Sequence, residues 1–385
     1  MGPRHEVSLG TIVREWGRIG CIGFGGPPTH IALLRRLCVE ERGWISAPEF
    51  EDGVAATNLL PGPASTQLAI LCAWRLRGTA GGVVGGLCFI VPGLILILAL
   101  SVVFLSPHPP RWILGIAAGA GAAVPAVALN AAAALAPASR ARAGTKRAQQ
   151  GRWVVFGVLG CAAAATVGPY LVLVLLACGL AEVVVRFKGG PVARAPAAAL
   201  VAVGHAVMIG GLGALAWVAF KVGALSYGGG FVIVPLMQHD AVTTYHWVTG
   251  GQFLTAVALG QVTPGPVVQT VAVVGYAAEG IRGGLFAALV AFAPSFLFVL
   301  LGAPRLDQIR ANGSVQAFLC GAGPAVVGAI AGSAVSLGLG LGHPWQIPVL
   351  GGALLWLFVA RRGVVSALVL GGAVGAVLSL AGVST

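Results

Sequence analysis

The chain has 385 residues, of which 57% are hydrophobic and 9% are charged, and its mean hydropathy is +0.93. Because a soluble domain carries about 25% charged residues, this composition excludes an ordinary soluble protein. The net charge of +12 is expected from basic cytoplasmic loops, which orient a membrane protein, so we do not expect a nucleic acid partner.

The N-terminal 43 residues contain a predicted helix break at Gly25-Gly26-Pro27-Pro28. Prolines lack an N–H donor and glycines are conformationally free, so this sequence does not continue a regular helix. Two arrangements of residues 8–43 agree with it. One is a pair of short helices hinged at the break, and the other is a span followed by an amphipathic surface helix.

Two Pro-Gly-Pro turns interrupt apolar stretches further along the chain. The first is Pro61-Gly62-Pro63 and the second is Pro264-Gly265-Pro266. A broken helix is tolerated at membrane depth only against protein or a water-filled cavity, and matching breaks in two halves indicate the substrate site of a transporter. We therefore predict re-entrant hairpins of two short helices over 47–77 and 250–280.

Long uncharged runs predict an all-α polytopic membrane protein with about 9–12 membrane segments in total. The predicted long spans are 83–105, 112–136, 153–169, 170–185, 198–226, 284–302, 314–338, 345–360 and 363–382.

The two turns belong to an internal duplication, with a shift of 203 residues up to the turns and of 202 residues after them. The paired positions include Trp44 with Trp247, Phe50 with Phe253, Pro92 with Pro294, and Gly119-Ala120-Gly121 with Gly321-Ala322-Gly323. We divide the chain into an N-terminal repeat, 1–196, and a C-terminal repeat, 197–385.

Basic residues predict that the two repeats have inverted topology. The loop 35–42 carries three arginines, whereas its repeat partner 238–250 carries no lysine or arginine. With alternating spans, the basic stretch 140–152 is cytoplasmic, and only Arg111 and Arg282 fall outside among the loop cations. The tips of the two hairpins are then expected to meet near the membrane midplane.

The turns are candidates for an anion site, because a helix that starts after a break presents free N–H groups and a partial positive charge. Nearby glycines allow close approach of the backbone to a ligand, and amide side chains supply donors. The alternative is that the glycines only permit tight helix packing and the amides only join helices. The predicted substrate-binding residues are Gly25, Gly26, Asn58, Pro61, Gly62, Pro63, Gln67, Gly228, Gly229, Gly230, Gln261, Pro264, Gly265, Pro266 and Gln269.

Two paired cations, Arg18 and Lys221, are added to this set, because cations inside a membrane are costly and usually functional. Their alternative is snorkelling to an interface. Acidic side chains that are candidates for proton coupling, and histidines, are expected mostly at interfaces or in structural roles. They are Glu15, Glu49, Asp52, Asp240, Glu279, His30, His205 and His239.

Catalytic and metal-binding motifs are absent from the sequence. We find no H-E-x-x-H, G-x-S-x-G or G-x-x-x-x-G-K-[ST] pattern, and the seven cysteines show no C-x-x-C spacing. We therefore expect no enzyme activity, catalytic residue, metal site or cofactor. An intramembrane hydrolase that acts on lipid phosphates is kept as an alternative from another class.

Motifs in both halves resemble the chromate ion transporter family. In the first half they are Phe24-Gly25-Gly26-Pro27, His30-Ile31-Ala32, Gly43-Trp44-Ile45 and Leu59-Leu60-Pro61-Gly62-Pro63 with Thr66-Gln67-Leu68-Ala69. In the second half they are Lys221-Val222-Gly223-Ala224, Tyr227-Gly228-Gly229-Gly230-Phe231 and Thr263-Pro264-Gly265-Pro266. The match in both halves indicates the long, two-domain form of the family.

The resemblance implies a multi-pass carrier of the inner (plasma) membrane that exports chromate, confers chromate resistance and uses the membrane potential or a proton gradient. It implies chromate as substrate, sulfate as a competitor and the lipid bilayer as surroundings, and it leaves a homodimer open. Before Leu-Leu-Pro-Gly-Pro, this chain has Asn58 where the family commonly has glutamine. After this motif, it has Ala64-Ser65 where the family tends to have asparagine. A transporter or exchanger of sulfate or molybdate is therefore the alternative within the class.

Overall fold

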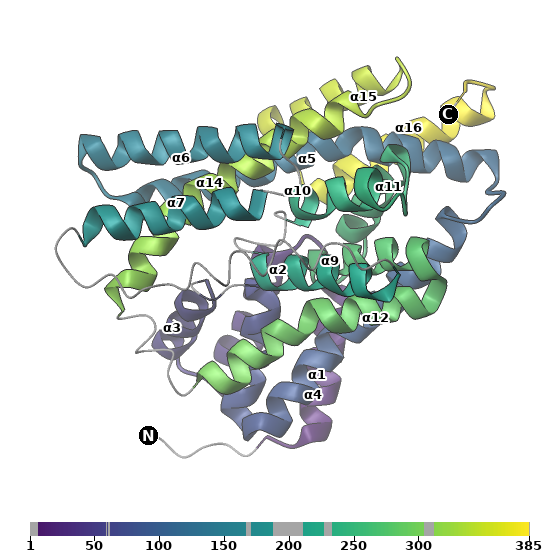
Figure 1. Cartoon of the computed structure of the whole chain (residues 1–385). Helices are drawn as coiled ribbons and strands as arrows, with labels where there is room; N and C mark the ends of the chain where they lie inside the picture. Colours follow the sequence, from purple (N-terminus) through teal and green to yellow (C-terminus); the bar gives the residue numbers. More distant parts are fainter. Residues whose placement is uncertain are drawn as a thin grey trace.

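The computed structural model describes residues 7–58, 60, 62–166, 171–187, 211–226, 233–303 and 312–384, and these are all-helical (Figure 1). The predicted site residues Pro61, Gly228, Gly229 and Gly230, together with His205, lie outside the described residues. The helices are α1 (Leu9–Ile22), α2 (Pro27–Arg35), α3 (Ala47–Thr57), α4 (Ala64–Phe104), α5 (Arg111–Ala143), α6 (Arg147–Thr166), α7 (Leu171–Arg186), α9 (Leu212–Leu225), α10 (Ile233–Gln238), α11 (Gly250–Val262), α12 (Thr270–Gly302), α14 (Gly313–Leu339), α15 (Gln346–Leu354) and α16 (Val364–Leu380).

Where the structure describes them, the predicted spans agree with these helices to within a few residues at most ends. The first part of the predicted span 198–226 lies outside the described residues. Among the described residues, four apolar stretches are long enough to cross a membrane: Ala64–Phe104, Arg111–Ala143, Val267–Gly302 and Gly313–Leu339. The chain is therefore a multi-pass membrane protein by the length and composition of its helices. At the N-terminus, α1 ends at Ile22 and α2 begins at Pro27, so the predicted break at Gly25-Gly26-Pro27-Pro28 separates two helices.

Two of the long stretches, α4 and α12, are not straight helices. Each contains one non-helical pair of residues: Arg77 (φ −147°, ψ 32°) with Gly78 (φ 58°, ψ −152°), and Glu279 (φ −144°, ψ 28°) with Gly280 (φ 62°, ψ −155°). The chain folds back at each pair, and glycines allow the two limbs to touch, since Gly85 packs against Ala73. The first limb of α4, 64–76, is about 20 Å long at 1.5 Å per residue. It is too short for a hydrocarbon core of about 30 Å.

Backbone features recur at matching positions before the turns as well. A π-helical turn covers Arg36–Glu41, and a second one covers His239–Thr244, 203 residues later. Each is followed by a residue with positive φ, Gly43 at 58° and His246 at 52°. Local conformation is therefore reproduced between the two parts of the chain, even where a glycine is replaced by a histidine.

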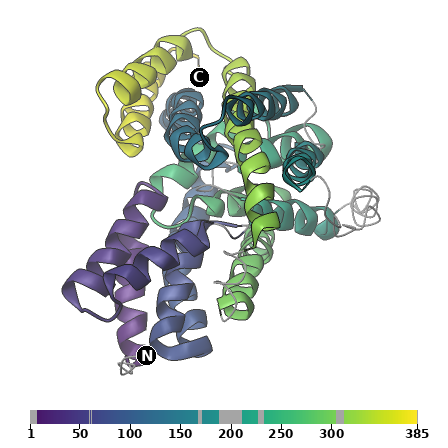
Figure 2. The same cartoon turned by 90° about the vertical axis from the view of Figure 1, so that its left-hand side faces the viewer.

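The helices pack in two groups (Figures 1 and 2). In the lower part of Figure 1, α4 packs on α1 and α12, and α12 packs on α9. In the upper part, α5 packs on α16, α14 and α15, and α14 also packs on α6 and α7. Helix α11 contacts both α5 and α12, and it leads the chain into the second Pro-Gly-Pro turn, between the groups.

Candidate functional site

The first Pro-Gly-Pro turn breaks the chain between α3 and α4, as predicted. Gly62 has a φ of +112°, which only glycine adopts without strain. The carbonyl of Pro63 accepts hydrogen bonds from the N–H groups of Thr66 and Gln67, at 3.0 and 3.1 Å, and so starts α4. The side chains of Thr66 and Gln67 are completely buried at the start of this helix.

The second turn lies between α11 and α12. Gly265 has a φ of +95°, and a 3₁₀ turn over Val267–Gln269 precedes α12, so the helix begins three residues later than at the first turn. The side chain of Gln269 is buried, and its Nε2 donates to the carbonyl of Ile90 in α4 at 2.8 Å. This bond ties the second turn to the other half of the chain.

The residues after the two reversals, 79–104 of α4 and 281–302 of α12, are called the long limbs. Each turn contacts the long limb of the other half at the residue that follows a proline. A Cβ built on Gly62 would lie 3.3 Å from Oγ of Ser295, which follows Pro294 in α12. A Cβ built on Gly93, which follows Pro92 in α4, would overlap the carbonyl oxygen of Pro264. Positions 93 and 295 are equivalent at a shift of 202, so the two contacts correspond to each other.

Buried polar atoms without partners gather on the segments that form or face the turns. Within the described residues, no hydrogen-bond partner is found for the hydroxyls of Thr66, Ser226 and Ser295, for Nε2 of Gln261 or for Oε1 of Gln269. A buried polar group left unpaired costs about 1–3 kcal/mol, so a cluster of them points to a polar ligand. Hydroxyl and amide donors suit the oxygen atoms of an oxyanion.

The break between α1 and α2 is linked to both turns through His30, which is fully buried. Its Nε2 lies 2.9 Å from the carbonyl oxygen of Gly23, and its Nδ1 lies 3.2 Å from Oγ of Ser65. The carbonyl of Gly23 also accepts the N–H of Gly265 at 3.0 Å. The motif around His30 therefore belongs to the architecture of the candidate site.

The predicted cations Arg18 and Lys221 are both engaged in ion pairs. Arg18 has a side chain that is 53% exposed, and it pairs with Glu15 at 3.2 Å and with Glu41 at 3.9 Å. Lys221 is buried and pairs with Asp240, which is also buried. Burial of Glu15 and Asp240 differs from the expectation that acidic groups lie mostly at interfaces, because arginine or lysine neighbours compensate their charge.

The other predicted residues take different positions. Asn58 is half-buried and ends α3, while Gln261 is buried near the end of α11. Gly25 is exposed, and Gly26 precedes α2, where an added Cβ would lie 3.8 Å from Val267 of the second turn. The structure therefore brings Gly26 to the second turn.

Sequence reasoning did not select Ser65, Thr66, Ser226 or Ser295 as site residues. A usable signal was present for Ser295, because it follows an intramembrane proline and aligns with Gly93 of the first half. The contact of Ser295 with Gly62 joins segments more than 200 residues apart, and no local pattern indicates it.

The sequence of this chain is similar to those of known membrane transport proteins. The chromate transporter family matches residues 10–210 and again residues 213–377. The chain is 31% identical over 341 residues to the chromate transport protein of Cupriavidus metallidurans, covering 86% of this chain and 82% of that protein. It is 33% identical over 337 residues to the chromate transport protein of Pseudomonas aeruginosa, covering 83% and 79%.

A third relative, the probable chromate transport protein of Synechococcus elongatus, is 30% identical over 342 residues, covering 86% of this chain and 85% of that protein. No solved structure gives a significant match. The two matches of the family, one in each half, together with the relatives of similar length, place the chain: it belongs to the chromate transporter family, in its long form with two matched halves.

Proposed function

We propose that this protein is a secondary transporter that exports chromate across the cytoplasmic membrane and so confers chromate resistance. Its family membership supports chromate as the substrate. The observation that carries the transport site is the group of buried, unpartnered polar atoms on the segments around the two Pro-Gly-Pro turns. The helix ends there expose backbone N–H groups to an anion.

The membrane potential can drive this export. Moving one charge through 100 mV is worth about 2.3 kcal/mol, so a dianion that leaves a negative interior gains about twice that amount. Proton antiport is the other proposed source of energy. Sulfate has the shape and charge of chromate and is proposed as a competitor.

We further propose that the halves are inverted repeats. The long limbs of α4 and α12 run antiparallel: a Cβ on Gly82 would lie 2.8 Å from Leu300, and one on Gly284 would lie 2.5 Å from Leu98. Positions 82 and 284 are equivalent, as are 98 and 300, so the two contacts are reciprocal. Reciprocal contacts between equivalent segments are typical of a twofold axis. The proposed axis passes between the two long limbs.

The directions of the packed helices support the proposed alternation of spans. Gly115 of α5 packs on Gly375 of α16, and Gly119 packs on Gly371, so these helices are antiparallel. Helix α14 packs on α6 through Gly328 on Gly157 and Gly332 on Cys161, so these two helices are parallel and are assigned the same direction. The proposed orientation has the end of α5 in the cytoplasm and the C-terminus of α16 outside.

Transport of sulfate or molybdate is the second candidate function. It is favoured by the departures from the family pattern at Asn58 and at Ala64-Ser65, both of which lie beside the first turn. An intramembrane hydrolase is set aside, since membership of a transporter family implies a function without catalysis.

The test is uptake into everted membrane vesicles, whose cytoplasmic face points outward. Vesicles that contain the protein and vesicles without it receive chromate, sulfate or molybdate at equal concentration. We expect protein-dependent uptake of chromate that sulfate reduces. Uptake of sulfate or molybdate with no uptake of chromate would retain a transporter and overturn the proposed substrate.

A further inference from the structure

We propose that the transported oxyanion binds at the first Pro-Gly-Pro turn, where the hydroxyls of Thr66 and Ser295 hold it, and that the second turn is structural. This inference rests on the proposed function. It assigns oxyanion binding to one of the two turns instead of to both. Both turns have a glycine with positive φ, but they differ in the side chains that line them and in the 3₁₀ turn that precedes α12.

The first turn is lined by hydroxyls contributed by both halves. Thr66 and Ser295 are both 0% exposed, and within the described residues neither hydroxyl has a hydrogen-bond partner. Ser295 points at the turn, since its Oγ lies 3.3 Å from a Cβ built on Gly62. Thr66 is the third residue of α4, and Cα–Cβ bonds lean toward the N-terminus of a helix, so its side chain leans toward the turn.

Backbone donors complete the first turn. The limb 64–76 begins directly after Pro63, and the N–H groups of Ala64 and Ser65 precede its first internal hydrogen bonds. They add a partial positive charge beside the two hydroxyls. The carbonyl of Gly223 also faces Gly62, at 3.3 Å from the built Cβ, so the anion is expected on the hydroxyl side of the turn.

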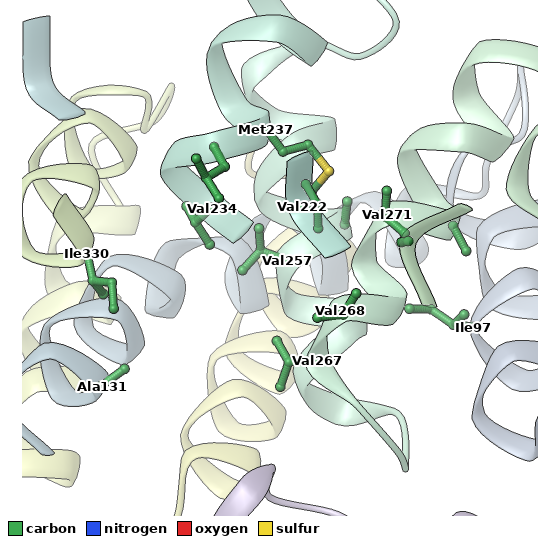
Figure 3. Close-up of a cluster of buried hydrophobic side chains, with 14 of the residues drawn as sticks. Ile97, Ala131, Val222, Val234, Met237, Val257, Val267, Val268, Val271 and Ile330 are labelled. Atoms are coloured by element: carbon green, nitrogen blue, oxygen red, sulfur yellow. The ribbon is translucent and has the colours of Figure 1, made fainter. Parts of the chain in front are cut away.

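Among the described residues, the second turn offers one side-chain donor without a partner, Nε2 of Gln261 in α11, and no hydroxyl without a partner at its helix start. Its Gly265 N–H donates to Gly23, and Nε2 of Gln269 donates to Ile90. Where the first turn has Ser65 and Thr66, the second has Val267 and Val268, and both valines lie in the hydrophobic core (Figure 3).

Contacts across the halves differ in the same way. The residue that faces the second turn is Gly93, whose α-carbon is packed directly on the carbonyl of Pro264 and leaves no room for a ligand. At the first turn the equivalent residue is Ser295, which brings a hydroxyl. A hydrogen bond from a hydroxyl to an anion is stronger than one between neutral groups, so these two side chains are expected to dominate affinity.

The test measures initial chromate uptake into everted vesicles at a fixed imposed potential, as a function of chromate concentration. The variants are Thr66→Val and Ser295→Ala, with Thr66→Ser as the variant that keeps a hydroxyl. The control is Ser101→Ala, because Ser101 is equally buried in α4 but donates to the carbonyl of Ile97 at 2.7 Å. A further variant, Val267→Ala, tests whether the second turn takes part in binding.

We expect Thr66→Val and Ser295→Ala each to raise the half-saturating chromate concentration roughly tenfold, the loss of one hydrogen bond to a charged group. Thr66→Ser keeps the hydroxyl and should recover most of the loss seen in Thr66→Val. The controls Ser101→Ala and Val267→Ala should stay within about twofold of wild type. The inference is overturned if Thr66→Val and Ser295→Ala match Ser101→Ala, or if Val267→Ala alone weakens binding.

A second measurement separates this inference from the identity of the substrate. Purified wild type is heated in detergent with chromate, sulfate or molybdate, and the anion that raises its unfolding temperature is identified. Thr66→Val and Ser295→Ala should lose that stabilisation, whichever anion gives it. If sulfate alone stabilises wild type and both variants lose the effect, the substrate is wrong and the site stands; if no anion stabilises wild type, the site is wrong.

Discussion

The backbone N–H of Gly265 donates a hydrogen bond to the carbonyl oxygen of Gly23 at 3.0 Å, which joins the second turn to the break between α1 and α2. The same carbonyl lies 2.9 Å from Nε2 of His30. Since a carbonyl only accepts, Nε2 must carry a hydrogen, and the neutral ring then accepts from the hydroxyl of Ser65 at Nδ1. His30 thus connects the two turns, one through Ser65 and the other through Gly23.

Removal of this connection should destabilise the protein. His30→Leu leaves the hydroxyl of Ser65 without its partner and takes one donor from Gly23, for an expected loss of about 1–3 kcal/mol per unpaired buried group. His30→Gln retains a donor for Gly23 and should lose less. The measurement is thermal unfolding of the purified protein in detergent.

The matched control for His30 is His108→Leu, because His108 is an exposed histidine in the loop before α5. It should unfold at the temperature of wild type. Equal unfolding temperatures of His30→Leu and wild type would contradict a structural connection through His30.

The reversals inside α4 and α12 depend on glycine. Gly78 and Gly280 have positive φ with ψ near −150°, a region that is essentially open to glycine only, and an added Cβ would meet no atom within 4 Å. Gly78→Ala and Gly280→Ala should therefore each lower the free energy of unfolding by about 1–3 kcal/mol through backbone strain alone. The two losses should be similar.

Chemical denaturation of the purified variants measures these two costs. Gly351→Ala is the control, since Gly351 lies inside α15 with equally open space, and alanine should slightly stabilise a regular helix. A loss of stability at Gly351 and none at Gly78 would show that the assigned reversals are wrong.

The architecture was largely predictable from sequence, because helix breaks and apolar lengths are local properties. Pro-Gly-Pro cannot remain helical, and the spans are uncharged over their whole length, so both features can be recognised without tertiary contacts. Arg18 shows the limit of such reasoning. Its charge suggests an anion ligand, whereas the side chain pairs with Glu15, three residues earlier in α1, and with Glu41, which the fold brings near from the π-helical turn.

The site was predictable only in outline. Gln67 and Gln269 could be selected, since they follow the turns in sequence. The contact of Ser295 with the first turn could not be predicted, because the packing of one half on the other creates it. His30 was recognised as part of a motif, but its two hydrogen bonds require the fold around the break after α1.

Removal of one partner from the buried pair of Lys221 and Asp240 should strongly destabilise the protein. Asp240→Asn leaves a buried ammonium without its carboxylate, and such a change costs about 3–5 kcal/mol. Lys221→Met in the same chain should recover part of the loss, because no uncompensated charge then remains. Unfolding of the single and double variants measures the coupling.

The exposed pair of Arg36 and Glu41, at 2.8 Å, is the comparison for the buried pair. Glu41→Gln should change stability by at most about 1 kcal/mol, since solvent screens exposed charges. Equal effects of Asp240→Asn and Glu41→Gln would contradict the assigned burial of the Lys221 pair.

The proposed inverted topology can be tested by cysteine labelling in intact cells. His246→Cys should react with a membrane-impermeant reagent added outside, and Lys146→Cys should react only after the membrane is opened. Both variants are made after alanine has replaced Cys21, Cys88 and Cys161, which are exposed or half-buried. If both positions report the same side, the inverted arrangement is wrong.

The measurement that tests the central claim most directly is chromate uptake into everted vesicles with and without an imposed potential, positive in the lumen. The lumen corresponds to the outside of the cell, so export appears as uptake. We expect wild type to take up chromate, faster when the lumen is positive, and Ser295→Ala to need a higher chromate concentration. Uptake equal to that of vesicles without the protein, at every potential and concentration, would contradict the assignment of this chain as a chromate exporter.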